Sequence, residues 1–360
     1  MGFCAFLVTF CASKKLPGAR GRVAPERTNF WEKVSRCVPT RPAKGESDRS
    51  PRMNQLHERR EPLHPHPPAA GESNPPAAGG GKKNNRIEAN HMSTYTLAFL
   101  GTGNMGSALA RAACTAIPAG EILLANRTAA KAEALAADLG CAVGTNQSAA
   151  AQGKFLFLGV KPQMMAGLLA EIAPTLAQRQ EPPILVSMAA GLTMAQIVQM
   201  AGGAYPVIRI MPNTPCAVGA GILLYDANGL VAEADLAQFT AAMAGAGLLD
   251  RLEEHLMDAG SAVAGCGPAF LCQFVEALAD GGVACGLPRQ KALRYAAKMV
   301  EGTARLMLES GQHPGQMKDA VCSPGGSTIA GVRALEQHGL RAAAMDAVIA
   351  AYQRTQELGK

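Results

Sequence analysis

Side chains that titrate near neutral pH are scarce in this sequence. Only seven of its 360 residues are histidine, and three of them follow residue 91: His255, His313 and His338. No lysine occurs between Lys161 and Lys291. Reduction of a carbonyl or oxidation of an alcohol usually needs a side chain that transfers a proton at the oxygen. The scarcity therefore argues against an alcohol or a carbonyl as the reacting group.

Metal-binding and redox-active cysteine patterns are absent as well. The ten cysteines include no C-x-x-C pair, and no Cys/His cluster has the spacing of a zinc site. Most lie in apolar segments, so we expect reduced thiols, no metal and a cytoplasmic location. No uninterrupted apolar run approaches the roughly 18 residues of a membrane-spanning helix, so no membrane association is expected.

The positive charge is confined to residues 1–91. That segment holds 16 of the 34 Lys+Arg, 8 of the 28 Asp+Glu and 11 of the 23 prolines, without apolar periodicity. We predict a disordered leader or an artefactual extension, with a transit peptide and a functional start at Met92 as open alternatives. The 18 basic and 20 acidic residues of positions 92–360 argue against nucleic-acid binding.

Residues 92–255 alternate between short apolar runs and alanine-rich segments, which predicts a Rossmann-type α/β domain. The runs are apolar throughout, as expected for a parallel, doubly wound sheet covered on both faces. The predicted strands are Thr96–Gly101, Glu121–Ala125, Lys154–Val160, Pro183–Ala189, Tyr205–Met211 and Ile222–Tyr225. The helices predicted between the first five are Ser107–Ala116, Ala129–Leu139, Met164–Ala177 and Thr193–Ala201.

Residues 256–360 contain no convincing strand, and we predict an all-helical domain for dimerisation and substrate binding. Much of Phe270–Ala284 is apolar on more than one face, and in so small a domain a partner subunit is the natural cover. The predicted helices are Ala269–Cys285, Arg289–Ser310, His313–Val321, Thr328–Gly339 and a last one from Arg341.

A dinucleotide-binding motif follows the first predicted strand. Three glycines are spaced as G-x-G-x-x-G between that strand and a helix, which is the context the motif requires. The first permits a tight turn, the second lets backbone approach a pyrophosphate, and the third lets helix and strand pack closely. The helix N-terminus adds N–H groups for the phosphates. We predict cofactor contacts from Gly101, Thr102, Gly103, Asn104, Met105 and Gly106.

The segment after the second predicted strand favours NADPH, with NADH as an alternative donor. An acid that binds the ribose of NAD is expected about 20 residues beyond the motif. The sequence there reads Asn126-Arg127-Thr128, with Lys131 one helical turn later. Charge and hydrogen bonds from these residues suit a 2′-phosphate. We predict cofactor contacts from all four, although Lys131 would equally suit a solvated helix face.

Later strand ends carry further candidates for the cofactor. Ligands of open α/β sheets bind at the carboxyl ends of strands, where Val160-Lys161-Pro162 and Asn213 are placed. We predict that they contact the ribose or nicotinamide end. A structural role, with the prolines as strand terminators, is equally open.

Residues 321–331 form a loop rich in glycine and hydroxyl groups, and they include no Lys, Arg, His, Asp or Glu. Ser327 and Thr328 open the helix that follows, whose N–H groups favour an anion. An iminium carbon accepts hydride without a protein acid, so positioning and electrostatics suffice. An imine that bears a carboxylate fits this loop, and a plain connector between helices is the alternative.

These motifs together resemble the pyrroline-5-carboxylate reductase family, over about residues 94–358. The most specific match is His313–Asp319 leading into Ser323–Thr328. The other matching segments are Phe99–Gly106, Val160–Gln163, Ser187–Gly191, Arg209–Pro215, Met257–Ala259 and Gly265–Phe270.

The resemblance implies NAD(P)H-dependent reduction of 1-pyrroline-5-carboxylate to L-proline, the last step of proline biosynthesis. It also implies a homodimer through the helical domain, a decamer of five dimers, and an active site between the cofactor domain of one subunit and helices of the dimer. By motif position, Thr328 contacts the substrate near its ring nitrogen, and Asn146 lies on the adenosine side. The remaining substrate residues are Ser323, Gly325, Gly326 and Ser327.

Three positions depart from the family pattern. Cys266 occupies a position at which the family often has serine. Phe270 replaces a common tyrosine, and Ser327 replaces a frequent threonine. None of these differences removes the Thr328 hydroxyl. The alternatives are another imine reductase, a β-hydroxyacid-type dehydrogenase, or a non-catalytic dinucleotide-binding sensor. The absence of a lysine on the helix that opens the second domain argues against the dehydrogenase.

Overall fold

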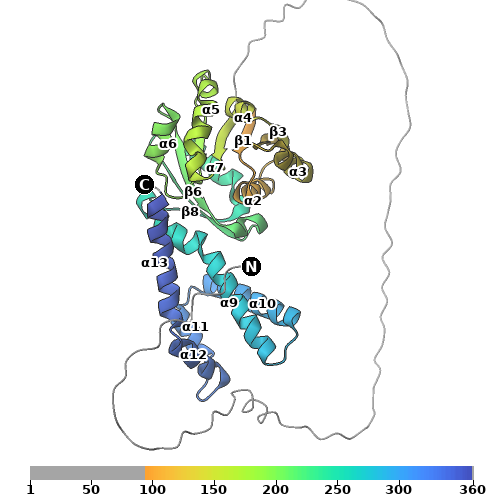
Figure 1. The fold of residues 1–360 in the computed structure, drawn as a ribbon, viewed down its shortest axis with the longest axis vertical. Coiled ribbons are helices and arrows are strands. Elements are labelled where there is room, and N and C mark those ends of the chain that lie inside the picture. Colours follow the sequence, from red (N-terminus) through yellow and green to blue (C-terminus); the bar gives the residue numbers. More distant parts are fainter. Residues whose placement is uncertain (1–93, 359–360) are drawn as a thin grey trace, which may run out of the picture. The chain divides into compact units, whose positions relative to one another are not determined.

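The computed structural model describes residues 94–358 (Figure 1). The predicted leader at residues 1–91 lies outside the described residues. A sheet is followed by helices, as the sequence predicts, but the sheet has eight strands where six are predicted, because β3 and β8 are missed. The strands are β1 (Tyr95–Leu100), β2 (Ile122–Ala125), β3 (Ala142–Gly144), β4 (Gly153–Leu158), β5 (Ile184–Ser187), β6 (Val207–Pro212), β7 (Gly221–Ala227) and β8 (Gly247–Arg251).

The strand order is β3-β2-β1-β4-β5-β6-β7-β8, and all neighbours are parallel except β6 and β7. The expectation of a wholly parallel sheet is therefore wrong at β7. Only residues 213–220 connect β6 to β7. A parallel crossover needs a dozen or more residues, so this short connection returns the chain antiparallel.

Helices cover both faces of the sheet, which gives it two separate cores. In β1, Leu97 and Phe99 face one core while Ala98 and Leu100 face the other. This alternation explains why the strands are apolar at every position. The first core is covered by α2 (Asn104–Ala113), α3 (Ala129–Leu139) and α7 (Glu233–Ala242), and the second by α4 (Asn146–Gln152), α5 (Met165–Ala177) and α6 (Met194–Ala201).

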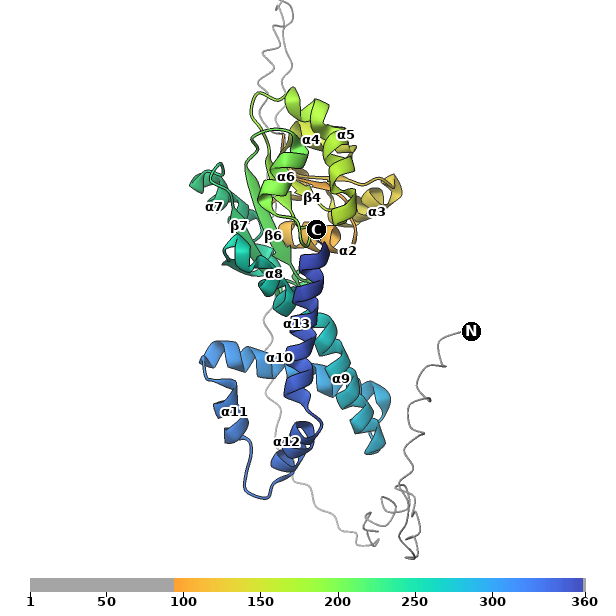
Figure 2. The same cartoon turned by 60° about the vertical axis from the view of Figure 1, so that its left-hand side comes forward.

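The segment after the sheet is helical, as predicted. It comprises α8 (Met257–Gly260), a π-helical turn (Ser261–Gly265), α9 (Gly267–Ala284), α10 (Arg289–Ser310), α11 (Pro314–Ala320), α12 (Ser327–Gln337) and α13 (Leu340–Leu358). α9 packs against α10, and α13 runs from α12 to α8 (Figures 1 and 2). The predicted boundary between residues 255 and 256 falls in a 3-10 turn and stays a prediction.

These helices bury little in one subunit. In α9, only Ala279 is buried, while Leu271 is 44 % exposed. In α10, Leu306 and Leu308 are also exposed. Apolar faces of this extent need a cover that a single described chain does not supply.

The stretch Glu254–Ala284 is long and apolar enough to cross a membrane, with a mean hydropathy of 1.5. No such segment is expected from the sequence, because no uninterrupted apolar run approaches 18 residues. A helix that packs against other protein can be equally long and apolar, and α9 packs against α10.

Candidate cofactor and substrate sites

The loop between β1 and α2 is built on close backbone contacts that only glycine permits. Gly101 has φ +115°, and a Cβ there would lie 2.3 Å from the carbonyl oxygen of Gly159. A Cβ on Gly106 would lie 2.2 Å from the carbonyl oxygen of Gly101. Gly159 follows β4, and its importance was missed in the sequence. The signal in the sequence is a glycine directly after β4, the strand that pairs with β1.

The middle glycine of the motif faces open space. No atom lies within 4 Å of the position that a Cβ on Gly103 would occupy. Gly103 is also the N-cap of α2, whose first turn has no side-chain cap and no acidic residue. The N–H groups of this turn can therefore bind an anion. The buried hydroxyl of Thr102 has no hydrogen-bond partner among the described residues. Together these features fit the pyrophosphate of a dinucleotide.

Asn126 supports this loop from the end of β2. Its Oδ1 accepts a hydrogen bond from the Thr102 backbone N–H at 3.1 Å, and its Nδ2 donates to the Thr128 carbonyl at 3.0 Å. The side chain thus joins the phosphate loop to the start of α3. These bonds give Asn126 a positioning role, and the predicted cofactor contact stays a prediction.

The predicted 2′-phosphate residues lie together at the start of α3. Arg127, Thr128 and Lys131 are exposed, and their side chains have no hydrogen-bond or ion-pair partner in residues 94–358. Thr128 is the N-cap of α3, and the first turn of that helix contains no acid. Two unpaired cations and a free hydroxyl beside a helix N-terminus can bind a phosphate group.

The other predicted cofactor residues are more dispersed. Val160 packs against the second core, Lys161 is exposed, and Pro162 opens a 3-10 turn after β4. Asn146 opens α4, where its Nδ2 donates to Glu171 on α5 at 3.1 Å. The predicted contacts of Val160, Lys161, Pro162 and Asn146 with the cofactor stay predictions.

Asn213 is buried, and its side chain is held by protein. Its Oδ1 accepts a hydrogen bond from the Ile222 N–H at 2.9 Å, and its Nδ2 donates to the Ala264 carbonyl at 3.1 Å. Ala264 belongs to the π-helical turn before α9. The amide therefore ties the end of β6 to the helical segment, and its predicted contact with the cofactor stays a prediction.

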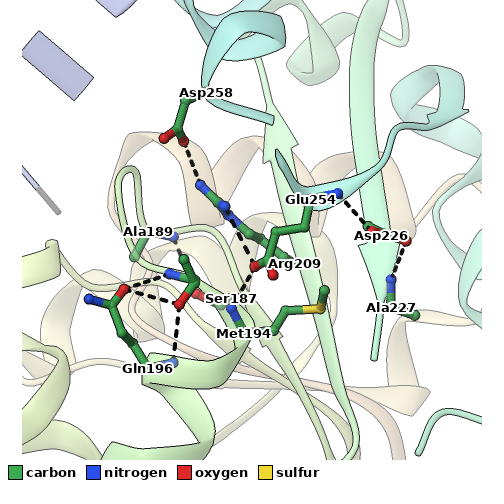
Figure 3. A network of polar contacts seen from close by, with 10 residues as sticks. Ser187, Ala189, Met194, Gln196, Arg209, Asp226, Ala227, Glu254 and Asp258 are labelled. Atoms are coloured by element: carbon green, nitrogen blue, oxygen red, sulfur yellow. Dashed lines mark hydrogen bonds and ion pairs between the residues drawn. The ribbon is translucent and has the colours of Figure 1, made fainter. Parts of the chain in front are cut away.

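An ionic network around the buried Arg209 was missed in the sequence (Figure 3). Arg209, on β6, is only 2 % exposed, and its Nη2 lies 2.6 Å from Asp258 Oδ1 on α8. Its Nη1 lies 3.6 Å from Glu254 Oε1. That carboxylate oxygen also accepts the Met194 N–H at 2.6 Å, at the N-terminus of α6. A lone arginine within an otherwise apolar strand is the signal that points to this network.

The predicted substrate loop is a tight turn that leads into α12. The Gly326 N–H donates to the Ser323 carbonyl at 3.0 Å, and Gly325 has φ +70°. Gly326 is the N-cap of α12, and the first turn has no side-chain cap and no acid. The hydroxyls of Ser327 and Thr328 are exposed and make no hydrogen bond among the described residues. The turn therefore offers free N–H and O–H donors to an anion.

The two candidate sites are separate within one chain. In residues 94–358, no hydrogen bond or ion pair links Ser323–Thr328 to the Gly101–Gly106 loop. α12 packs against α13 (Figure 2).

Comparisons with known proteins match both parts of the chain. The family model described as pyrroline-5-carboxylate reductase dimerisation matches residues 254–358. The model described as NADP oxidoreductase coenzyme F420-dependent matches residues 96–191. The first match covers the exposed apolar helices, and the second covers the glycine motif.

Curated relatives agree with these matches. A pyrroline-5-carboxylate reductase of Synechocystis is 46 % identical over 215 residues, which cover 60 % of this chain and 79 % of that protein. The enzyme of Pisum sativum is 36 % identical over 267 residues, covering 74 % and 96 %. That of Escherichia coli is 36 % identical, covering 73 % and 98 %.

Solved structures agree too. The Plasmodium falciparum pyrroline carboxylate reductase with NADP bound has a TM-score of 0.67 and 29 % identity, covering 75 % of this chain and all of that one. The 1-pyrroline-5-carboxylate reductase of Streptococcus pyogenes has a TM-score of 0.66 and 28 % identity, covering 73 % and 98 %.

Proposed function

The chain belongs to the pyrroline-5-carboxylate reductase family, and from this premise we propose that it reduces 1-pyrroline-5-carboxylate to L-proline with NADPH as the hydride donor. NADH is the alternative donor. The reaction is an oxidoreduction at a CH–NH group and completes proline biosynthesis. The observation that carries the proposal is the hydroxyl-rich turn at Ser323–Thr328, which offers donors to a carboxylate but no acid or base.

The chain's own residues would hold the cofactor at two places. The N–H groups at the start of α2 bind the pyrophosphate beside Gly103. Arg127, Thr128 and Lys131 bind the 2′-phosphate. The bound cofactor supplies the hydride. Asn126 keeps these two places in register, because it bonds to both the phosphate loop and the start of α3.

The substrate is held by the turn before α12. Its carboxylate accepts hydrogen bonds from the free N–H groups of the first turn, and the Thr328 hydroxyl forms a hydrogen bond near the ring nitrogen. An imine that arrives protonated needs no proton from the enzyme before hydride transfer. Catalysis then rests on orientation and on excluding water from the reacting carbon.

A second subunit completes the site in this proposal. The exposed apolar residues of α9 and α10 supply the dimer interface, supported by the dimerisation match at residues 254–358. When the helical segments of two subunits pair, the turn at Ser323–Thr328 meets a Gly101–Gly106 loop. We further propose that five dimers form a decamer and that the enzyme is cytoplasmic. Neither membrane nor nucleic acid has a part in this function.

The test is an assay of purified full-length protein with 1-pyrroline-5-carboxylate and NADPH. We expect NADPH oxidation with equimolar formation of L-proline. Parallel reactions contain β-hydroxy acids with NADP⁺, and other cyclic imines with NADPH. Turnover only of hydroxy acids or only of other imines would refute the proposal. Tight NADPH binding with no turnover of any substrate would instead indicate a sensor.

A further inference from the structure

Two cysteine thiols lie side by side at the edge of the cofactor-binding sheet. The Sγ atoms of Cys114 and Cys141 are 3.5 Å apart, and either thiol can donate the hydrogen bond between them. Both are partly buried and pack against the same core. Among the described cysteines, no other two share a hydrogen bond. The apolar surroundings of the cysteines predict reduced thiols, and nothing in the sequence indicates the contact between these two, which are 27 positions apart.

The thiol pair is remote from the phosphate loop. α2 begins at Asn104 beside the glycine motif and ends at Ala113, so Cys114 lies at its far end. A helix of that length spans about 15 Å. Cys141 directly precedes β3 and therefore lies at the amino edge of the sheet. The candidate cofactor residues lie at the carboxyl edge.

We propose that Cys114 and Cys141 form a redox modification site, at which hydrogen peroxide oxidises the two thiols to an intramolecular disulfide that fastens α2 to the β3 edge while leaving the cofactor site competent. The crosslink encloses residues 114–141, which include β2, the 2′-phosphate residues and α3. β3 is the terminal strand of the sheet and pairs only with β2. The disulfide therefore secures one of the two terminal strands of the sheet.

The oxidation balances in two steps. The thiolate of Cys114 attacks one peroxide oxygen, the O–O bond breaks, and a sulfenic acid and one water form once a proton is taken up. The Cys141 sulfur then attacks the Cys114 sulfur, an S–S bond forms, the S–O bond breaks, and a second water leaves. The two thiols lose two electrons and two protons, and the peroxide is reduced to water.

The surroundings of the thiols assign the order of these steps. Burial, the hydrogen bond to Cys114 and the charge of Cys114 together raise the pKa of Cys141 to about 12. Cys141 is therefore protonated at neutral pH and is a poor first nucleophile. Cys141 therefore acts second, on the sulfur of Cys114, which lies 3.5 Å from its own sulfur in the reduced pair.

The experiment oxidises the purified full-length protein with hydrogen peroxide, blocks remaining thiols and maps tryptic peptides by mass spectrometry. Cleavage at Arg127 and Lys131 places the two cysteines in different peptides. We expect a linked pair lighter by two hydrogen atoms than the separate thiol peptides together. Dithiothreitol should reverse the link, and the Tm of the oxidised protein should rise by roughly 5–10 °C.

Variants decide the assignment. Cys114→Ser and Cys141→Ser should each abolish the linked peptide and the rise in Tm, whereas Cys285→Ser, at an exposed position, should retain both. The NADPH Kd of the oxidised protein should stay within about twofold of the reduced value, because the phosphate loop is distant. Alkylation of both thiols after peroxide treatment would overturn the proposal. A crosslinked protein that no longer binds NADPH would overturn it too.

Discussion

Arg209 Nη2 lies 2.6 Å from Asp258 Oδ1, and this ion pair joins the interior strand β6 to α8, the first α-helix after the sheet. The Arg209 side chain is 3 % exposed and that of Asp258 is 23 % exposed. A cation buried to this extent needs its partners, because it has little access to water.

Removing one partner of this pair should be costly. Asp258→Ala should lower the free energy of unfolding by about 2–4 kcal/mol, since it leaves Arg209 with only the more distant Glu254. Denaturant unfolding followed by circular dichroism measures the loss. The matched control is Asp138→Ala in the exposed pair with Arg111, which should cost less than about 1 kcal/mol. Equal losses in both variants would contradict the role of the buried network.

Two glycines of the motif should respond oppositely to alanine. Gly106→Ala should destabilise the protein by about 1–3 kcal/mol, because the new methyl would overlap the Gly101 carbonyl. Gly103→Ala should fold with stability near wild type, since its methyl enters open space. That space is where a pyrophosphate would approach, so its NADPH Kd should rise at least about tenfold. Thermal unfolding and titration of NADPH fluorescence separate the two effects.

Arg127 should set the preference between the two nicotinamide cofactors. Its guanidinium is exposed and unpaired within the described residues, so a 2′-phosphate is its natural partner. Arg127→Ala should raise the KM for NADPH about tenfold, equivalent to ~1.4 kcal/mol, and leave that for NADH nearly unchanged. Lys291→Ala, in the helical segment, is the charge-matched control. A parallel rise in both KM values would exclude a 2′-phosphate contact.

The helical segment should depend on a second copy of the chain. Leu271 on α9 is 44 % exposed in one subunit, and Leu271→Glu should place a charge in the dimer interface. We expect a monomer by analytical ultracentrifugation and loss of imine turnover with NADPH binding retained. Leu230→Glu is the control, because Leu230 is 57 % exposed beside the sheet. A dimeric Leu271→Glu protein would show that this part of α9 is not at the interface.

Local patterns predicted most of this fold and both candidate loops. Apolar runs located six strands because each is buried on both faces, and the glycine motif located the turn before α2. Two strands were missed: β3 has three residues, too few for a periodic signal, and β8 ends in the charged pair Asp250-Arg251, which leaves it no continuous apolar run. The pairing of Arg209 with Asp258 was also missed, because it joins residues 49 positions apart through tertiary packing. Contacts of this kind depend on how elements meet rather than on neighbouring sequence.

Thr328 should matter for the imine and not for the cofactor. Its hydroxyl is exposed at the start of α12 and makes no hydrogen bond among the described residues, so removing it leaves no buried group unpaired. Thr328→Ala should therefore retain its Tm and NADPH Kd while kcat/KM for 1-pyrroline-5-carboxylate falls about 100-fold, as when one positioned donor is lost. Thr328→Ser restores the hydroxyl and should recover most activity. Thr303→Ala on α10 is the control, because that hydroxyl bonds only within its own helix. Unchanged kinetics for Thr328→Ala would remove Thr328 from the site, and a loss not rescued by serine would point to its methyl group instead.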